Sequence, residues 1–226
     1  DLAVAVQSHW FSVGTAVSWA EAGVGAIATQ SFTNKSFGPR GLALLRSGMP
    51  AQQALDELLR TDEGRDVRQV AIVDSKGRVA THTGSKCIDM AGHRQGNQFS
   101  VQANMMLRAT VPDAMAKAFE ASARLPLAER LLAALDAAQA QGGDIRGRQS
   151  AALLVVRGKA TATPWEDRLI DLRVDDSAEP LRELGRLLRL HRAYEHMNAG
   201  DLAVEKNDVP GAIREYEAAE KLFPEN

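Results

Sequence analysis

The sequence has little that would tie it to a disulfide scaffold, a nucleic acid or a membrane. Cys87 is its one cysteine, so no disulfide can form within the chain. Its 27 basic and 29 acidic side chains nearly balance and form no basic stripe, which argues against a nucleic-acid-binding protein. No apolar run approaches the roughly 20 residues that a membrane-spanning helix needs. The 226 residues, 45% hydrophobic and 25% charged, are instead typical of a globular protein with a sizeable core.

The familiar cofactor and metal motifs are also lacking. The only G-x-G pattern near a strand begins at Gly23, where the strand starts, and no third glycine follows, so a dinucleotide-binding turn is excluded. His82, Cys87 and His93 have a spacing that matches no zinc pattern, and a fourth ligand is missing. We therefore expect no cofactor and no bound metal.

Short apolar runs dominate the first two thirds of the chain. Their interiors consist of Ala, Val, Ile and Leu with little polar alternation, which is typical of strands covered on both faces. The loop Ser75–Arg78 contains Gly77 and joins two of these runs, which predicts an antiparallel hairpin. The predicted strands are Leu2–Gln7, Val24–Thr29, Gln69–Asp74, Val79–Thr83, Phe99–Met106 and Ala151–Val156.

Helical periodicity appears in two pairs of segments between these strands. The segments open near Gly38, Pro50, Thr110 and Leu127, and they carry apolar residues at helical spacing. Paired helices beside antiparallel strands that are buried on both faces predict an α+β fold, a four-layer αββα sandwich.

Changes in composition divide the chain into three parts. We expect an αββα domain over 1–158, a connector with one short strand over 159–177, and an all-helical tail over 178–226. The first residue, Asp1, leads directly into an apolar strand, and a domain seldom begins in the middle of its sheet. We therefore expect a further strand in front of it.

Residues 1–176 contain, in this order, the segments LAVAVQSHWFSVG, WAEAGVGAIATQSF, FGPRGLALLRSG, RQVAIVDSKGRVATHTG and GGDIRGRQSAALLVV. Together these segments resemble a bacterial and archaeal family of unknown function, the DUF1028 family. The resemblance implies membership of the N-terminal nucleophile (Ntn) hydrolase-like superfamily and its αββα fold. It implies no established reaction.

Two functional hypotheses follow. In Ntn hydrolases the first residue supplies a Thr, Ser or Cys nucleophile, and its own α-amine is the general base. Asp1 cannot serve in this way, so the resemblance implies a nucleophile before Asp1, and no catalytic residue can be named. The first hypothesis is an amide-bond hydrolase acting on a small or peptide-like substrate. The alternative is a non-catalytic binding or assembly module whose helical tail recruits a partner.

Candidate substrate-binding residues lie where the predicted strands end. Neighbours on a strand point to opposite faces, so Ser8 and His9 do not form a direct relay, and Ser8 either binds substrate or ends its strand. Gln30 either binds a substrate amide or satisfies loop backbone. Gln102 and Asn104 lie two apart, hence on one face, and either line a cleft or form a structural hydrogen-bond network.

Arg68 precedes a buried strand and is a further candidate. It either holds a substrate carboxylate bidentately or forms an ion pair with Asp66 or Asp74.

The richest stretch is Gly142–Ser150, which contains three glycines between a helix and a buried strand. Asp144 and Arg146 could bind a charged substrate, with Gln149 at the mouth of the strand. The alternative is a helix end followed by an Asp–Arg pair that braces a tight turn.

The helical tail resembles one tetratricopeptide repeat, in which small residues let two antiparallel helices approach closely. The matching positions are Gly200, Ala212, Tyr216, Ala219 and Pro224. One repeat cannot bury its own apolar face. We expect Leu181–Ala193 to supply a third helix, or another surface to cover that face.

The same uncovered apolar surface favours a homodimer. A single unpaired cysteine favours the cytoplasm over export, although the family's association with envelope-type tails leaves export open. The expected partner is a small-molecule or peptide-like substrate, with no nucleic acid and no membrane span.

Overall fold

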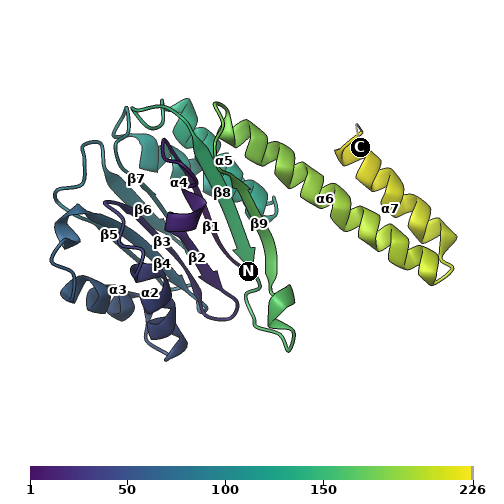
Figure 1. The fold of residues 1–226 in the computed structure, drawn as a ribbon, viewed down its shortest axis with the longest axis horizontal. Coiled ribbons are helices and arrows are strands. Elements are labelled where there is room, and N and C mark those ends of the chain that lie inside the picture. The colour runs from purple at the N-terminus through teal and green to yellow at the C-terminus, as the bar shows by residue number, and fades with distance from the viewer. Residues whose placement is uncertain (225–226) are drawn as a thin grey trace. The chain divides into compact units, whose positions relative to one another are not determined.

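The computed structural model describes residues 1–224 and divides the chain into two compact units, Asp1–Leu181 and Arg182–Asn226 (Figure 1). The first unit is a mixed α/β structure with several sheets, and the second is helical. No helix within residues 1–224 is long and apolar enough to cross a membrane.

The first unit contains three antiparallel sheets, which we call sheets A, B and C. Sheet A has the strand order β1-β8-β9, sheet B the order β2-β3-β4-β5, and sheet C pairs β6 with β7. The strands are β1 (Leu2–Ser8), β2 (Ser18–Glu21), β3 (Gly25–Ser31), β4 (Arg68–Asp74), β5 (Val79–Thr83), β6 (Gly92–Gly96), β7 (Phe99–Ala103), β8 (Ser150–Val156) and β9 (Arg168–Val174).

The helices of this unit contact the sheets in pairs. Helix α2 packs against β2 and β3, α3 against β4 and β5, α4 against β6 and β7, and α5 against β1 and β8. Two short 3-10 turns complete the unit, η1 (Arg65–Val67) and η2 (Pro164–Glu166). The helices are α1 (Gly14–Val17), α2 (Phe37–Arg46), α3 (Ala51–Arg60), α4 (Val111–Ala121) and α5 (Leu127–Ala140).

The hydrophobic core has one part under α2 and α3 and another between sheets A and B. Under the helices, Ile27, Phe37 and Leu58 are fully buried. Between the sheets, Val4 of β1 and Leu154 of β8 pack with Ala26 of β3. Sheet B is therefore covered on both faces, which explains why β3 and β4 read as continuous apolar runs.

Every predicted strand is present, and the hairpin around Gly77, where φ is +76°, is confirmed as antiparallel. The predicted strand Phe99–Met106 is too long, since β7 ends at Ala103. Met106 instead forms an isolated bridge with Asp144, because the chain has already turned toward another loop. Strands β2 and β6 were not predicted, because their sequences SWAE and GHRQG carry no long apolar run.

The second unit consists of α6 (Pro180–Glu205), which begins at the boundary, and α7 (Val209–Leu222). Of the two expectations for the apolar face of the repeat, a separate helix over Leu181–Ala193 is wrong, because no proline interrupts α6 after Pro180 and the helix is continuous. Cover by another surface stays a prediction. A Cβ atom added to Gly200 would lie 2.5 Å from the ring of Tyr216, so these helices approach closely at that glycine.

Candidate functional site

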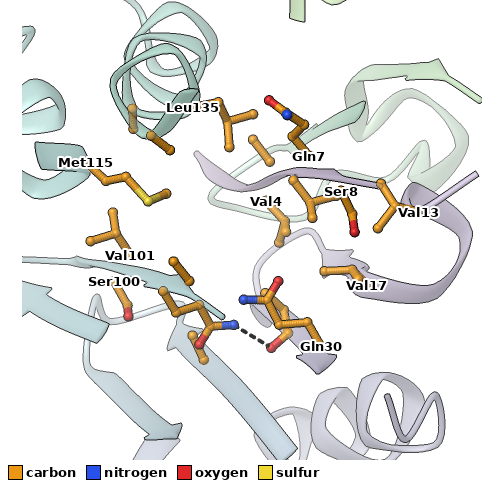
Figure 2. A pocket seen from close by; sticks show the side chains of 18 of the residues that line it. Val4, Gln7, Ser8, Val13, Val17, Gln30, Ser100, Val101, Met115 and Leu135 are labelled. Carbon is orange, nitrogen blue, oxygen red and sulfur yellow. Dashed lines mark hydrogen bonds between the residues drawn. The ribbon is translucent and has the colours of Figure 1, made fainter. Parts of the chain in front are cut away.

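A cavity of about 570 Å³ lies inside the first unit, lined by β1, β3, β4, β7, α4 and α5 (Figure 2). Strand β1 contributes every residue from Leu2 to Ser8, and β7 contributes every residue from Phe99 to Ala103. A strand that lined a cavity with one face would contribute alternate residues only. The cavity therefore adjoins the edges of β1 and β7, including their backbone.

In the other walls of the cavity, the lining residues recur at the spacing of one face of a strand or of a helix. Strand β3 contributes Ala26, Ala28 and Gln30, with Ser31 at its end, and β4 contributes Ala71 and Val73; apart from Ser31 these are alternate residues. These side chains form one wall, and the helices form another. The residues from α4 and α5 recur mainly at intervals of three and four, which marks one face of each helix: Met115, Phe119, Leu127, Leu131, Ala134, Leu135, Ala138 and Gln139.

The free edge of β1 is the unusual feature of this cavity. Strand β1 pairs with β8 along Leu2–Ser8, and within residues 1–224 no strand pairs with its other edge. The N–H and C=O groups of alternate residues along that edge lack ladder partners. We call the space between the edges of β1 and β7 the strand slot.

Amide side chains meet beside the slot around Gln69, a fully buried residue of β4. Its Nε2 donates to the carbonyl oxygens of Ala103, at 2.9 Å, and Gly92, at 3.2 Å, so the orientation of the amide is fixed. Its Oε1 accepts from Gln30 Nε2 at 2.8 Å and from Asn104 Nδ2 at 3.0 Å. The side-chain oxygens of Gln30 and Asn104 therefore remain available as acceptors.

A buried acceptor without a partner lies close by. Gln102 Nε2 donates to the carbonyl oxygen of Ala28 at 3.4 Å, which only the nitrogen of the amide can do. Its Oε1 is buried and has no partner among the described residues. A buried carbonyl oxygen of this kind is costly unless a bound molecule or water supplies a donor.

An ion pair lies at the end of the cavity near Ser8. Asp144 accepts from Arg146 Nε at 3.0 Å and from Arg146 Nη2 at 2.6 Å. It also accepts from the backbone N–H groups of Arg146, at 2.9 Å, and His9, at 3.3 Å. Arg146 Nη2 reaches Ser8 Oγ at 3.4 Å, so the guanidinium lies over the end of β1.

Both partners of this pair stay charged. Burial alone would raise the pKa of Asp144, but the side-chain and backbone hydrogen bonds from Arg146 and the backbone bond from His9 hold that pKa below its ordinary value. The hydrogen bond to Asp144 raises the pKa of Arg146. The guanidinium at the end of β1 is thus a permanent cation.

The loop that carries the pair depends on its glycines. Gly142, Gly143 and Gly147 have φ values of +108°, +62° and +119°, a region that side chains with a Cβ seldom adopt. They reverse the chain between α5 and β8, and this turn brings Asp144 back against the N–H group of His9.

Most of the predicted site residues meet at this cavity. Its lining includes Ser8, Gln30, Gln102, Asn104, Asp144 and Arg146. Ser8 and Gln30 enter it from β1 and β3 respectively (Figure 2).

Arg68 and Gln149 are not among the cavity-lining residues. The expected partners of Arg68 are wrong: it pairs with Asp62 at 2.7 Å, because η1 and the loop before it turn Asp62 toward the strand, while Asp74 pairs with Arg78. Gln149 Nε2 donates to Asp176 Oδ1 at 3.1 Å.

Gln69 was not singled out from the sequence, although it joins Gln30 to Asn104. The available signal was a long polar side chain at the start of an otherwise apolar strand. In such a strand a buried amide needs hydrogen-bond partners from neighbouring segments.

The residues considered for a metal site have other partners. His82 Nε2 contacts the carbonyl oxygen of Arg65 at 2.8 Å, and His93 Nδ1 contacts Thr83 Oγ1 at 2.9 Å. Burial lowers the pKa of His93. Over residues 1–224 no group of three or more His, Cys, Asp and Glu side chains is placed to hold a metal ion.

Comparison with known proteins places the first unit in a family. The model of DUF1028, a family of unknown function, matches residues 1–184. The crystal structure of protein SPO2555 from Silicibacter pomeroyi, described as a DUF1028 protein, is 31% identical to this chain, with a TM-score of 0.73. That match covers 83% of this chain and 81% of the other. No curated protein matches the chain. The chain therefore belongs to the DUF1028 family, whose function is unknown.

Proposed function

We propose that the protein hydrolyses an amide bond in a small or peptide-like substrate, at the end of the cavity near Ser8. In this proposal the first unit is a four-layer αββα sandwich of the Ntn hydrolase type. Its layers are α2 with α3, then sheet B, then sheets A and C side by side, then α4 with α5. The contacts of these helices with these sheets support the arrangement.

The observation that carries the proposal is the strand slot, whose polar end has amide and guanidinium groups. In this proposal a strand that precedes Asp1 lies between the edges of β1 and β7. Joined to Asp1 by a tight hairpin, it would run antiparallel to β1, so its first residue would lie near Ser8. Arg146 contacts Ser8 there, and Gln30 and Asn104 line the same cavity.

The residues of the cavity itself supply no activated nucleophile. Ser8 Oγ accepts from Arg146, and no His, Asp or Glu among the described residues accepts its proton. In the proposed reaction, the α-amine of the preceding strand takes the proton of its own hydroxyl or thiol, which attacks the amide carbon. The leaving amine takes that proton, and water then hydrolyses the acyl-enzyme. The groups near Ser8 bind and orient the substrate.

The test is to identify the N-terminal residue by mass spectrometry, and to measure amide hydrolysis, for the protein isolated from its native source. A free N-terminal Thr, Ser or Cys, whose replacement by Ala abolishes hydrolysis of an acylated amino acid, is the expected result. A retained initiator Met or a blocked N-terminus in the active protein would overturn the proposal.

A second candidate, assembly through the helical tail, is favoured by exposed apolar residues on α7. Val209, Ile213 and Tyr216 recur at intervals of four and three on one face and are 61%, 52% and 38% exposed. We propose that this pair of helices acts as a single tetratricopeptide-like repeat in a homodimer. Ile213→Glu should lower the molecular mass in solution measured by light scattering, whereas Arg214→Glu, its neighbour, should not. An unchanged mass for Ile213→Glu would reject this role.

A further inference from the structure

The polar end of the cavity presents two kinds of groups that are free to bind. On one side are donors: Arg146 Nη1 and the Ser8 hydroxyl hydrogen have no acceptor among the described residues. On another side are acceptors: the side-chain oxygens of Gln30, Asn104 and Gln102 have no donor within the same range. A ligand that satisfies both sets needs an anionic or carbonyl group and an N–H group.

The donor side suits a carboxylate in particular. Arg146 is already oriented by Asp144, whose side chain is 6% exposed, so binding does not have to order the guanidinium. Asp144 needs no further donor from the ligand, because four N–H groups already donate to its oxygens. Arg146 and the adjacent Ser8 hydroxyl can each take one oxygen of a carboxylate.

The acceptor side suits an amide N–H. The oxygens of Gln30 and Asn104 are held by their nitrogen contacts with the buried Gln69. Gln102 Oε1 is buried beside the same cavity without a donor, which makes an occupant with an N–H group favourable there.

The rim near this end supplies an apolar surface. Trp10, Phe32 and Ile88 line the cavity and are 61%, 56% and 39% exposed. They come from different loops, so they offer a surface for an apolar side chain.

We propose that this end of the cavity binds an N-acylated amino acid, or the C-terminal residue of a short peptide, with an apolar side chain. The free carboxylate lies on Arg146 and Ser8, and the adjacent amide N–H donates to one of the side-chain oxygens of Gln30, Asn104 and Gln102 that lack a donor. This inference narrows the substrate class of the proposed hydrolase. Cleavage of the bound ligand rests on that proposed function, whereas binding of the ligand does not.

The test compares two ligands that differ only in charge, N-acetyl-leucine and N-acetyl-leucinamide, by isothermal titration calorimetry at pH 7. The acid should bind about 10- to 100-fold more tightly, the range for a hydrogen bond to a charged group. Arg146→Gln should remove this preference, and Ser8→Ala should reduce it several-fold. Arg148→Gln is the matched control, since Arg148 lies in the same loop, pairs with Glu179 and does not line the cavity.

Removing Arg146 alone leaves Asp144 buried without its partner, so the double variant Asp144→Asn, Arg146→Gln is measured beside it, with folding checked by circular dichroism. Equal binding of acid and amide, or no binding of either, would overturn the inference. So would a preference for the acid that survives in the double variant.

Failure of the hydrolase proposal gives a different result. Arg146-dependent binding of the acid without turnover by the native protein would leave this inference standing and reject the hydrolase. Equal turnover of neutral and acidic amides, unchanged by Arg146→Gln, would support the hydrolase and reject this inference.

Discussion

Strands β1 and β8 are neighbours in sheet A and have similar apolar sequences, LAVAVQS and SAALLVV, yet their environments differ. Strand β8 pairs with β1 on one edge and β9 on the other, and all of its residues are buried. Strand β1 alternates between buried and partly exposed residues, and its outer edge borders the cavity. A strand covered on both faces can therefore still expose an edge. In this protein the exposed edge borders the candidate site.

The largest difference should appear when a matched leucine is truncated in each strand. Leu153 of β8 is 1% exposed and Leu2 of β1 is 8% exposed. Leu153→Ala should cost close to the upper end of about 2–5 kcal/mol of unfolding free energy, and Leu2→Ala close to the lower end. Denaturant unfolding measures both. Equal losses would mean that the edge position of β1 does not weaken its packing.

Replacing a small residue by a larger one should also cost more stability in β8 than in β1. Ala152 is 2% exposed, and a Cβ on Gly14 would lie only 2.5 Å from its methyl group, so Ala152→Leu should cost about 1–3 kcal/mol. Ala5 of β1 is partly exposed and lines the cavity, so Ala5→Leu should change stability by about 0.5 kcal/mol or less. Thermal unfolding of both variants tests this. A large loss for Ala5→Leu would show that the cavity wall cannot accept the added atoms.

The serines that face each other across these strands offer a finer test. Ser8 pairs in register with Ser150, which is fully buried, accepts from the backbone N–H of Val13 at 3.0 Å and donates to the carbonyl oxygen of Trp10. Ser150→Ala should cost about 1–2 kcal/mol because it leaves these groups unpaired. Ser8→Ala should leave stability nearly unchanged and weaken ligand binding. Measured unfolding curves that show the opposite order would contradict the comparison.

The smallest effect should be the pH dependence of the unfolding free energy that Asp144 contributes at the end of β1. The pKa of Asp144 is lower in the folded protein than in the unfolded chain, so its contribution to stability is present above the unfolded pKa of about 3.9. That contribution disappears as the pH falls through the lower, folded pKa. The unfolding free energy of Asp144→Asn should therefore fall less between about pH 5 and pH 2 than that of the parent protein. Parallel curves would show that Asp144 does not contribute to acid unfolding.

Much of the fold was predictable because its signals are local. Apolar runs marked β1, β3 and β8, and the short loop containing Gly77 marked the β4–β5 hairpin. Strand β6 was missed, because GHRQG has no apolar pattern and is placed by pairing with β7.

The candidate site was predictable only in part. Ser8 and Gln30 were found because polar residues at the ends of apolar strands stand out, and Arg146 was found because it lies in the glycine-rich stretch Gly142–Ser150. Gln69 was overlooked, because its importance comes from contacts with Gln30 and Asn104, which lie 39 and 35 residues away in sequence. Arg68 was a candidate because it precedes a buried strand, and the partners expected for it were Asp66 and Asp74; its actual partner, Asp62, is brought to it by the folded loop.

The sequence by itself determined that the chain is globular, which apolar segments form strands, and which family the chain resembles, because these depend on composition and short-range pattern. Only the tertiary structure decided which edge of sheet A stays open and which polar groups meet beside it. The physical reason is that the apolar pattern of a strand indicates only which of its faces are buried. It carries no information about which strand, if any, pairs with its edge.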